Sequence, residues 1–419
     1  MKYKVTNRYF ILFVLLLIVV SRSTRLSDIA VLFYSFFVAL FSNFSAALSQ
    51  INVSVADNFL SLLLIVVLGL FFVFSRRKYS VFNKNLSFSS LIIILLLIFF
   101  VFAPVVSTTA PDFQNNIGVT KLLPPFSAVN YIYPEREKYN TDFGSLRNRF
   151  LNEDIIYVDS IKKSGDDFYY YQKGEKVKAE NDKVRFNNEI PAVHSRLFLL
   201  GTDEFGRDIF SRLVYGTRIS MIVGLGAVIV SFILGIGFGF LSGYSGRVID
   251  TVLNRFTDTF LSIPVIFLVI LILAFFGNSI FAIIIILGFS GWMSLFKIVR
   301  SEVISVKQKD YFITATKVGL PGRKLLIKEI LPVIIAPVIV NLVFQYGNVI
   351  LAEAALSYLG LGTGLNYPSW GGMIEAGQEY LSQAWWMILF PGLALILTLF
   401  TANNIGRDLN RYYNPRISK

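Results

Sequence analysis

The stretch from Asp310 to Pro332, DYFITATKVGLPGRKLLIKEILP, decides the fold, because it is a short charged segment between two long apolar runs. Its first part predicts a short helix with Asp310 as N-cap, which ends at Gly319 because glycine readily adopts the left-handed conformation of a helix stop. A second short helix is expected from about Arg323 to Leu331, before Pro332 opens the next apolar span. Basic side chains cannot enter hydrocarbon cheaply, which predicts a cytoplasmic position and a soluble partner for this segment. They are Lys307, Lys309, Lys317, Arg323, Lys324 and Lys328.

The composition is that of a polytopic membrane protein. The chain has 419 residues, of which 54% are hydrophobic, and its mean hydropathy is +0.61. The net charge of +12 does not indicate nucleic-acid binding, because the Lys and Arg residues cluster at the ends of apolar segments, where they orient helices. With no cysteine and one histidine, His194, the sequence argues against zinc sites, disulfides and Cys or His nucleophiles. We therefore expect no catalytic residue, no metal and no cofactor.

Apolar runs that approach or reach the length of a bilayer helix predict about eight crossings. They lie at 28–48, 58–75, 87–106, 219–241, 259–277, 279–298, 333–352 and 384–403. A shorter run, Tyr9–Val20, follows basic residues as in a signal peptide, but without a small-residue cleavage site it is predicted to be a retained membrane segment. The basic residues at 76–84 place the loop before the 87–106 run inside. This puts 107–218 outside, and both the 310–332 stretch and the C-terminal tail inside.

The polar region 107–198 is predicted to be a small external insertion of α/β or β structure. Segments 154–161 and 168–173 alternate enough to form paired strands around a turn at 164–166. Two interpretations stay open: a spacer or lid without ligand chemistry, or a surface that contacts a solute receptor. The candidate anchors in the second case are Tyr169, Tyr170 and Tyr171.

A second long motif, LGTDEFGRDIFSRLVYGTRIS, occupies Leu200–Ser220. Thr202 or Asp203 is expected to cap a helix that lies along the outer interface, with one apolar face and one face that carries Arg and Asp side chains. These charges either anchor the helix among lipid headgroups or serve gating or receptor docking, and the residues alone do not choose between these roles.

The first stretch is similar to a segment of a known family, the permease subunits of bacterial ABC importers. It resembles their coupling loop, or EAA loop, in which Glu-Ala-Ala is followed by a glycine and later by Ile-Leu-Pro. Here Ile313-Thr314-Ala315 replaces Glu-Ala-Ala, while the glycine, the Ile-Leu-Pro and the preceding acidic-Tyr pair are kept. The resemblance implies that the ATPase-coupling residues are Asp310, Tyr311, Ala315, Gly319, Ile330, Leu331 and Pro332.

The second motif resembles the Gly-Thr-Asp-x-x-Gly-Arg-Asp-x-x-Ser-Arg segment of the second permease subunit in dipeptide, oligopeptide and nickel importers. The matching residues are Gly201, Thr202, Asp203, Gly206, Arg207, Asp208, Ser211 and Arg212. The resemblance covers roughly 85–106 and 197–413, and it leaves the N-terminal segments and the insertion uncovered.

The resemblance implies an all-α polytopic membrane protein with the transmembrane domain of a type I ABC importer, located in the cytoplasmic (inner) membrane of a bacterium. We expect extra N-terminal membrane segments at 1–84, a first core helix at 85–106 and the external insertion at 107–198. The permease core is expected at 199–413, with a cytoplasmic coupling loop at 300–332 and a cytoplasmic tail at 414–419.

No Gly-x-x-x-x-Gly-Lys-Ser/Thr phosphate loop occurs in the sequence, so transport energy is expected from separate ATPase subunits. The resemblance implies a homologous second permease subunit, two cytoplasmic ATPase subunits, an extracytoplasmic solute-binding receptor, membrane lipid and a peptide substrate. The leading expectation is import of di- or oligopeptides by alternating access. Two alternatives stay open: the same architecture importing nickel or another small solute, and a non-transporting membrane scaffold or channel.

Glu353 is the candidate pore residue, because a carboxylate near the outer end of an apolar helix is costly unless it faces water or a partner. The alternative is that Glu353 lies beyond the hydrocarbon edge. Gly224, Gly235 and Gly239 occur at or near multiples of four residues, which favours close helix packing over a ligand site.

Overall fold

The structure is a computed structural model that describes residues 7–42, 53–74, 87–114, 116–133, 155–164, 167–178, 186–187, 190–362 and 368–413. The chain divides into two compact units. The first comprises Met1–Arg218 and Ala376–Pro391, and the second comprises Ile219–Glu375 and Gly392–Lys419. Three helices therefore belong partly to each unit, namely α8 (Ile209–Ser245), α15 (Trp370–Gln378) and α16 (Trp386–Tyr413).

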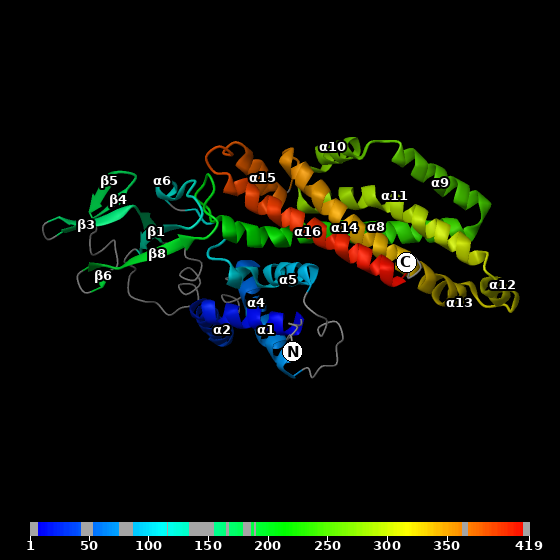
Figure 1. The fold of residues 1–419 in the computed structure, drawn as a ribbon, viewed down its shortest axis with the longest axis horizontal. Helices are drawn as coiled ribbons and strands as arrows, with labels where there is room; N and C mark the ends of the chain where they lie inside the picture. Colours follow the sequence, from blue (N-terminus) through cyan, green and yellow to red (C-terminus); the bar gives the residue numbers. More distant parts are fainter. Residues whose placement is uncertain are drawn as a thin grey trace. The chain divides into compact units, whose positions relative to one another are not determined.

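In the described residues, the N-terminal part of the first unit has four helices that pack on one another (Figure 1). They are α1 (Asn7–Ser21), α2 (Ser23–Ser42), α4 (Val53–Phe74) and α5 (Phe88–Val106). The apolar stretches of α1 and α2 meet at a bend of 77°, so the predicted short run 9–20 and the start of the 28–48 run form a bent pair. Residues 43–48 of that second run lie outside the described residues. The shared core includes Leu15, Ile29, Ile65, Ile98 and Phe102.

Two arginine side chains tie these helices together through backbone carbonyls. Arg22 donates to the carbonyl of Val106 at 2.9 Å, at the end of α5. Arg218 donates to the carbonyls of Phe100 and Val101 at 2.5 and 2.9 Å, and it forms an ion pair with Asp57 of α4. Because a guanidinium carries five N–H donors, the Arg218 side chain holds α4 and α5 at the same time.

The described residues of the predicted insertion fold mainly as β structure, and they include the short helix α6 (Ile117–Thr120). One antiparallel sheet has the order β2-β1-β8, a second has the order β3-β4-β5, and β6 pairs with β7. The strands are β1 (Ser127–Ile132), β2 (Ile156–Val158), β3 (Ser160–Ser164), β4 (Asp167–Gln172), β5 (Glu175–Lys178), β6 (Phe186–Asn187), β7 (Ile190–Pro191) and β8 (Val193–Phe198).

The predicted hairpin is confirmed for β3 and β4, which pair in register from Ser160↔Tyr171 to Ser164↔Asp167. Residues 165–166 of the predicted turn lie outside the described residues. The predicted strand at 154–161 is wrong as one strand, because β2 ends at Val158 and β3 begins at Ser160 in another sheet. The change of partner occurs at Asp159, whose N–H donates to the carbonyl of Tyr171 at 2.8 Å.

The second unit contains the helices of the predicted core. After α8 come α9 (Arg247–Leu261), α10 (Val265–Phe276), α11 (Ile280–Lys307), α12 (Asp310–Lys317), α13 (Gly322–Leu325), the π-helical turn η1 (Leu326–Ile330) and α14 (Leu331–Tyr358). Among the described residues, five helices are long and apolar enough to cross a membrane, and the bent pair of α1 and α2 would make a sixth span. The five helices are α5, α8, α11, α14 together with η1, and α16.

The predicted continuous span at 259–277 is wrong. Helix α9 ends at Leu261, and the 12-residue apolar helix α10 starts only after Pro264. Pro264 has no N–H to donate and also disfavours helical geometry at the residue before it, so the chain breaks where the hydropathy stays high. The predicted spans at 219–241 and 333–352 lie within the longer helices α8 and α14. The spans at 279–298 and 384–403 match parts of α11 and α16, but each starts one or two residues before its helix begins.

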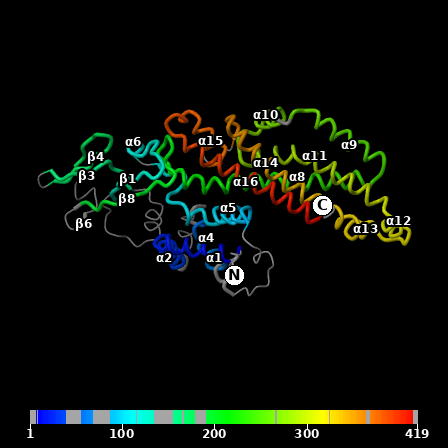
Figure 2. Tube along the Cα trace, in the orientation of Figure 1, coloured from blue at the N-terminus to red at the C-terminus, as the bar shows by residue number. Residues whose placement is uncertain are grey.

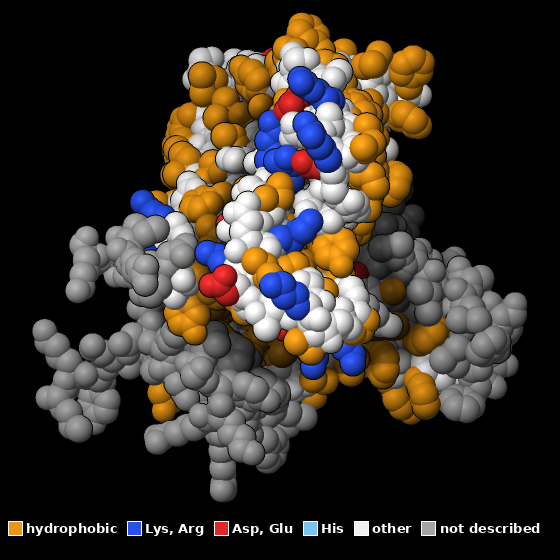
Figure 3. Space-filling view, turned by 90° about the vertical axis from the view of Figure 1, so that its right-hand side faces the viewer, with side chains coloured by type: hydrophobic (Ala, Val, Ile, Leu, Met, Phe, Trp, Pro, Cys, Tyr) orange, Lys and Arg blue, Asp and Glu red, His pale blue; other side chains and the backbone are white. Residues whose placement is uncertain are grey.

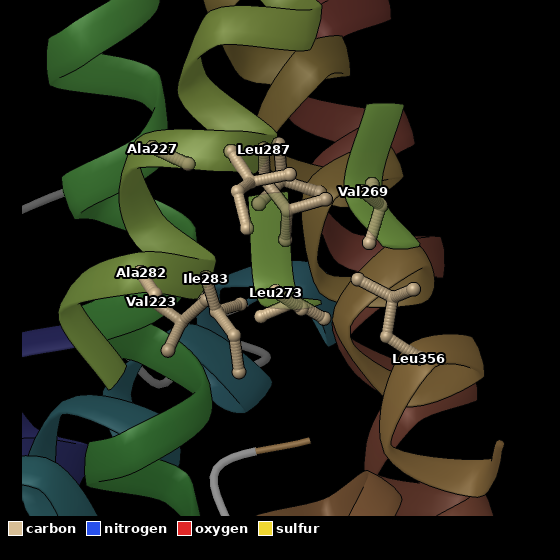
Figure 4. Packing of buried hydrophobic residues seen from close by; sticks show 10 residues of the cluster. Val223, Ala227, Val269, Leu273, Ala282, Ile283, Leu287 and Leu356 are labelled. Carbon is tan, nitrogen blue, oxygen red and sulfur yellow. The ribbon is translucent and has the colours of Figure 1, made fainter. Parts of the chain in front are cut away.

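The core of the second unit lies where α8, α10, α11 and α14 meet (Figure 4). The predicted packing role of the α8 glycines is confirmed. A Cβ atom at Gly235 would lie 2.8 Å from the side chain of Leu295, and one at Gly239 would lie 2.8 Å from the side chain of Val299. Small residues four apart on α8 thus let α11 approach closely, as is common between membrane helices.

Candidate functional site

The 310–332 stretch forms a compact turn between α11 and α14 (Figure 2). The predicted N-cap is off by one residue. Lys309 occupies the N-cap position without a side-chain capping bond, and Asp310 is the first residue of α12, where a carboxylate interacts favourably with the helix dipole. The glycine stop is confirmed, because Gly319 has a φ of 84°. The N–H of Leu320 donates to the carbonyl of Ala315, and that of Gly319 donates to the carbonyl of Thr316. These two bonds form a Schellman motif, the ending that a left-handed residue permits.

The second predicted short helix is present, but it continues into α14 through one π-helical turn. The N–H of Leu331 donates to the carbonyl of Leu326, five residues earlier. Pro332 has no N–H, so the carbonyl of Lys328 lacks its usual donor four residues later, and a local change to π geometry accompanies this loss. Pro332 therefore marks the start of the apolar span, as predicted, without ending the helix before it.

Apolar side chains fix this turn to the helices of its unit. Phe312, Leu325 and Ile330 are buried in one cluster with residues of α11 and α14, and Ala315 and Leu320 pack against it. Lys307, at the end of α11, donates to the carbonyls of Gly243 and Tyr244 at 3.1 and 3.0 Å. A lysine that binds the last carbonyls of α8 caps that helix, and its positive charge interacts favourably with the helix dipole. A displacement of α12 would therefore act on α8, α11 and α14 together.

The other side of α12 is open. Tyr311, Ile313 and Val318 are exposed, Val318 to 74%, and the Leu331 side chain is also exposed. The nearby Lys309, Lys317, Lys324 and Lys328 are exposed as well. The surface around α12 and α13 presents Lys and Arg side chains among hydrophobic ones (Figure 3). This combination is typical of a surface that a partner covers.

An ion pair that the sequence did not predict joins α9 to α11 near this turn. The Nε and Nη2 atoms of Arg300 donate to the two carboxylate oxygens of Asp250 at 2.5 and 2.7 Å, and the hydroxyl of Ser242 donates to the same carboxylate at 2.5 Å. The bidentate geometry is the strong form of an Arg–carboxylate pair. No local motif links residues 50 positions apart, so only the fold reveals it.

The Asp250 pair predicts a specific pH dependence of stability. Hydrogen bonds from Arg300 lower the pKa of Asp250 below its usual value of 3.8. The stabilisation is therefore full above the pKa of the unfolded chain and is lost as the pH falls through the lower pKa of the folded state. We expect Asp250→Asn to lower the melting temperature at neutral pH, and the gap from the wild type to shrink below about pH 4. Thermal unfolding in detergent across pH measures this, and a gap that stays constant on acidification would contradict it.

The Gly201–Arg212 motif does not form the predicted surface helix. Asp203 folds the chain into a tight turn, in which its Oδ1 atom accepts from the N–H groups of Phe205 and Arg207 at 2.9 and 2.8 Å. Helix α8 starts only at Ile209, and its first N–H groups are capped by Asp208, which accepts from the N–H groups of Phe210 and Ser211. The predicted caps, Thr202 and Asp203, were therefore wrong.

The charged residues of the motif are buried and paired instead of facing headgroups. Arg207 donates from Nε to Asp203 at 2.6 Å, and Arg212 lies 3.6 Å from the same carboxylate and 3.4 Å from Asp112. Burial raises the pKa of Asp112, which the Arg212 charge opposes. Burial also raises the pKa of Glu204, and the Asp203 charge adds to that rise. A single missing partner here would leave a buried charge uncompensated.

The same motif joins two earlier parts of the chain. The Thr202 hydroxyl donates to the carbonyl of Thr120 and accepts from the N–H of Leu123 at 2.8 Å. The Ser211 hydroxyl accepts from the N–H groups of Thr108 and Thr109 at 3.1 and 3.0 Å. The residues after α5, the start of the insertion and the start of α8 thus meet in one junction, which we call the Gly201–Arg212 junction.

Glu353, the predicted pore residue, is fully buried within its unit. Its Oε1 atom accepts from the hydroxyl of Ser357 at 2.9 Å, and its Oε2 atom accepts from that of Ser220 at 3.4 Å. The Ser220 hydroxyl in turn accepts from the N–H of Trp370 at 3.4 Å. The carboxylate therefore connects α8, α14 and the start of α15, while a contact with a transport path stays a prediction.

Comparison with known proteins gives a consistent result. Residues 235–419 match the family described as "binding-protein-dependent transport system inner membrane component". The chain is 37% identical over 217 residues, which is 52% of this chain and 71% of the relative, to the dipeptide transport system permease protein DppC of Alkalihalophilus pseudofirmus. It is 37% identical over 216 residues, covering 52% and 70% of the two chains, to the oligopeptide transport system permease protein OppC of Haemophilus influenzae.

A third relative and one solved structure are similar to parts of the chain. The dipeptide transport system permease protein DppC of Bacillus subtilis is 34% identical over 220 residues, covering 52% of this chain and 69% of that one. Among solved structures, a chain of the inward-facing MetNI methionine ABC transporter has a TM-score of 0.39 at 14% identity, covering 47% of this chain and 96% of that one.

Proposed function

Because the chain belongs to the family of binding-protein-dependent transport system inner membrane components, we propose that it is the permease subunit of an ABC importer for di- or oligopeptides. The observation that carries the substrate class is its 37% identity to a dipeptide and to an oligopeptide permease protein. The chain works in the cytoplasmic membrane and moves substrate by alternating access, without covalent chemistry.

The turn from Asp310 to Pro332 is the site at which ATPase subunits act on this chain. Exposed Tyr311, Ile313 and Val318 offer the apolar contacts, and the surrounding lysines keep the turn in the cytoplasm. Phe312 is buried against α11 and α14, and Lys307 binds the last carbonyls of α8, so a displacement of α12 would move the adjacent ends of these helices. The sequence holds no phosphate loop of its own, so two separate ATPases supply the energy.

The remaining partners are proposed from the similarity to peptide permease proteins. A homologous second permease subunit completes the pathway, and an extracytoplasmic receptor delivers the peptide. Residues 107–198 lie on the outer side of the membrane, and residues 1–84 add membrane segments to the core at 199–413. The Gly201–Arg212 junction holds the insertion to the core helix α8 through the Arg212–Asp112 ion pair and the hydroxyl bonds of Thr202 and Ser211.

Transport in vesicles tests this proposal. The chain is reconstituted with its sister permease, both ATPases and the receptor, and uptake of a radiolabelled oligopeptide is followed after addition of ATP. We expect uptake that requires ATP, and no uptake with ATPase subunits that cannot hydrolyse it. Nickel in place of peptide forms a second arm. Uptake of nickel but not of peptide would contradict the substrate class, and uptake of neither would contradict the transporter itself.

A further inference from the structure

The outer face of the β3-β4-β5 sheet carries an ordered set of tyrosines and lysines. Residues that pair across antiparallel strands point to the same face. The pairs Lys162↔Tyr169, Tyr169↔Lys178 and Tyr171↔Lys176 therefore place five side chains on one side. We call this side the Tyr–Lys face, and its members are Lys162, Tyr169, Tyr171, Lys176 and Lys178.

The opposite side of the same sheet is already used by the fold. Ile161, Phe168 and Tyr170 pack against the buried Ile132 and Val158 of the other sheet. Tyr170 is therefore a core residue, although it stands between two tyrosines of the Tyr–Lys face. Because strand residues alternate between faces, the three consecutive tyrosines cannot act as one set of anchors.

The geometry of the Tyr–Lys face is not that of a simple solvated surface. The Lys176 ammonium lies 3.8 Å from the ring centroid of Tyr169, and the Lys162 ammonium lies 5.5 Å from that of Tyr171. Both rings are half-buried, while all three lysines are exposed. Cations held over rings in this way keep the aromatic side chains in place and leave the positive charges available to a partner.

The charge of the face selects the chemistry of that partner. Asp167 also points to this side and lies 2.6 Å from the Lys178 ammonium. Three ammonium groups therefore face one carboxylate, which leaves a net charge of 3 − 1 = +2 on the described residues of the face. A pair of tyrosines inside a cationic rim is typical of a protein interface, in which aromatic anchors supply affinity and rim charges select the partner.

We propose that the Tyr–Lys face docks an acidic patch on the extracytoplasmic peptide receptor. The inference rests on the proposed function, because it takes residues 107–198 to lie on the outer side. It assigns a function of its own to the insertion. The lysines increase the rate of encounter with the receptor, and Tyr169 and Tyr171 hold the docked complex.

The test measures binding of the receptor to the assembled transporter in phosphatidylcholine nanodiscs. We expect the double variant Lys162→Glu/Lys176→Glu to raise the receptor Kd by about tenfold or more. Wild-type binding should weaken as salt is added. Tyr169→Ala/Tyr171→Ala should accelerate dissociation. The control is Lys163→Glu, the same kind of substitution at a single lysine that lies on the strand of Lys162 but on the opposite face, and it should leave the Kd unchanged. Lys162→Arg/Lys176→Arg should retain binding.

Three outcomes would overturn this inference. The first is an unchanged Kd in the Glu double variant, and the second is an equal loss in the Lys163→Glu control, which would indicate damage to the sheet. The third is that the Glu double variant loses binding to phosphatidylglycerol vesicles but still binds the receptor, which would assign the face to lipid. Wild-type peptide uptake is measured in parallel. If the wild type takes up peptide and the face variants bind the receptor with the wild-type Kd, the inference fails and the proposed function stands.

Discussion

Replacing Gly319 with valine is expected to abolish ATP-driven peptide uptake while leaving the helices of the core folded. Gly319 has a φ of 84°, and nothing lies within 4 Å of a Cβ built there, so the only penalty is conformational. The left-handed conformation costs a non-glycine residue about 1–2 kcal/mol, and more when it is β-branched. The Schellman motif would then give way, and α12 would lose its fixed exit toward Pro321. Uptake and ATPase activity of the reconstituted complex measure the effect.

Two control variants test whether the left-handed conformation of residue 319 is the cause of the loss. Gly319→Asn should retain most activity, because asparagine tolerates the left-handed conformation better than other residues do. Gly237→Ala changes a helical glycine that also has nothing within 4 Å of the position an added methyl group would take, and it should be silent. Full uptake by the valine variant, or equal loss in the asparagine variant, would show that the left-handed turn does not carry the coupling.

Replacing Gly201 with alanine is expected to prevent stable folding of the first unit. Gly201 combines a φ of 81° with a Cβ position only 2.4 Å from the carbonyl oxygen of Leu123 and 2.9 Å from the ring nitrogen of Trp386. The backbone oxygen cannot move without breaking the bonds that Thr202 makes to Thr120 and Leu123. The conformational and steric costs together reach about 2–5 kcal/mol, a large share of the stability of a typical domain.

The control for Gly201 is Gly360, which has a similar φ of 75° but nothing within 4 Å of its Cβ position. Gly360→Ala should cost only the conformational part, about 1–2 kcal/mol. The yield of monodisperse protein after size-exclusion chromatography and its melting temperature compare the two. A Gly201→Ala variant as stable as Gly360→Ala would mean that the junction is looser than the contacts indicate.

Local chemistry explains why the 310–332 turn could be predicted. The left-handed glycine and the proline act on their own neighbours, so Gly319 and Pro332 mark the same positions in the sequence and in the fold. The N-cap of α8 was predicted wrongly because several neighbouring residues could fill that position. Thr202, Asp203 and Asp208 all carry acceptors within a few residues, and only the tight turn made by Asp203 shows that Asp208 is the cap of α8.

Long-range pairing explains what could not be predicted. Asp203, Arg207 and Arg212 have the spacing of a polar helix face, but Asp112, which pairs with Arg212, and the contacts of Thr202 come from distant residues. The hydroxyls that surround Glu353 likewise come partly from Ser220, more than a hundred residues earlier. The break before Pro264 escaped a hydropathy window because the residues on both sides are apolar. In the first two cases the missing information is a contact, whereas the break at Pro264 follows from a residue type that hydropathy does not measure.

The accessibility of residue 318 tests the central claim most directly. This claim is that the turn from Asp310 to Pro332 is exposed in the cytoplasm and is moved by the ATPase subunits. The chain has no cysteine, so Val318→Cys introduces the only thiol, at a side chain that is 74% exposed. A membrane-impermeant maleimide should leave it unlabelled in intact cells, label it after permeabilisation, and label it less when the ATPases are bound. Labelling of residue 318 in intact cells would place the turn on the outer side and contradict the account.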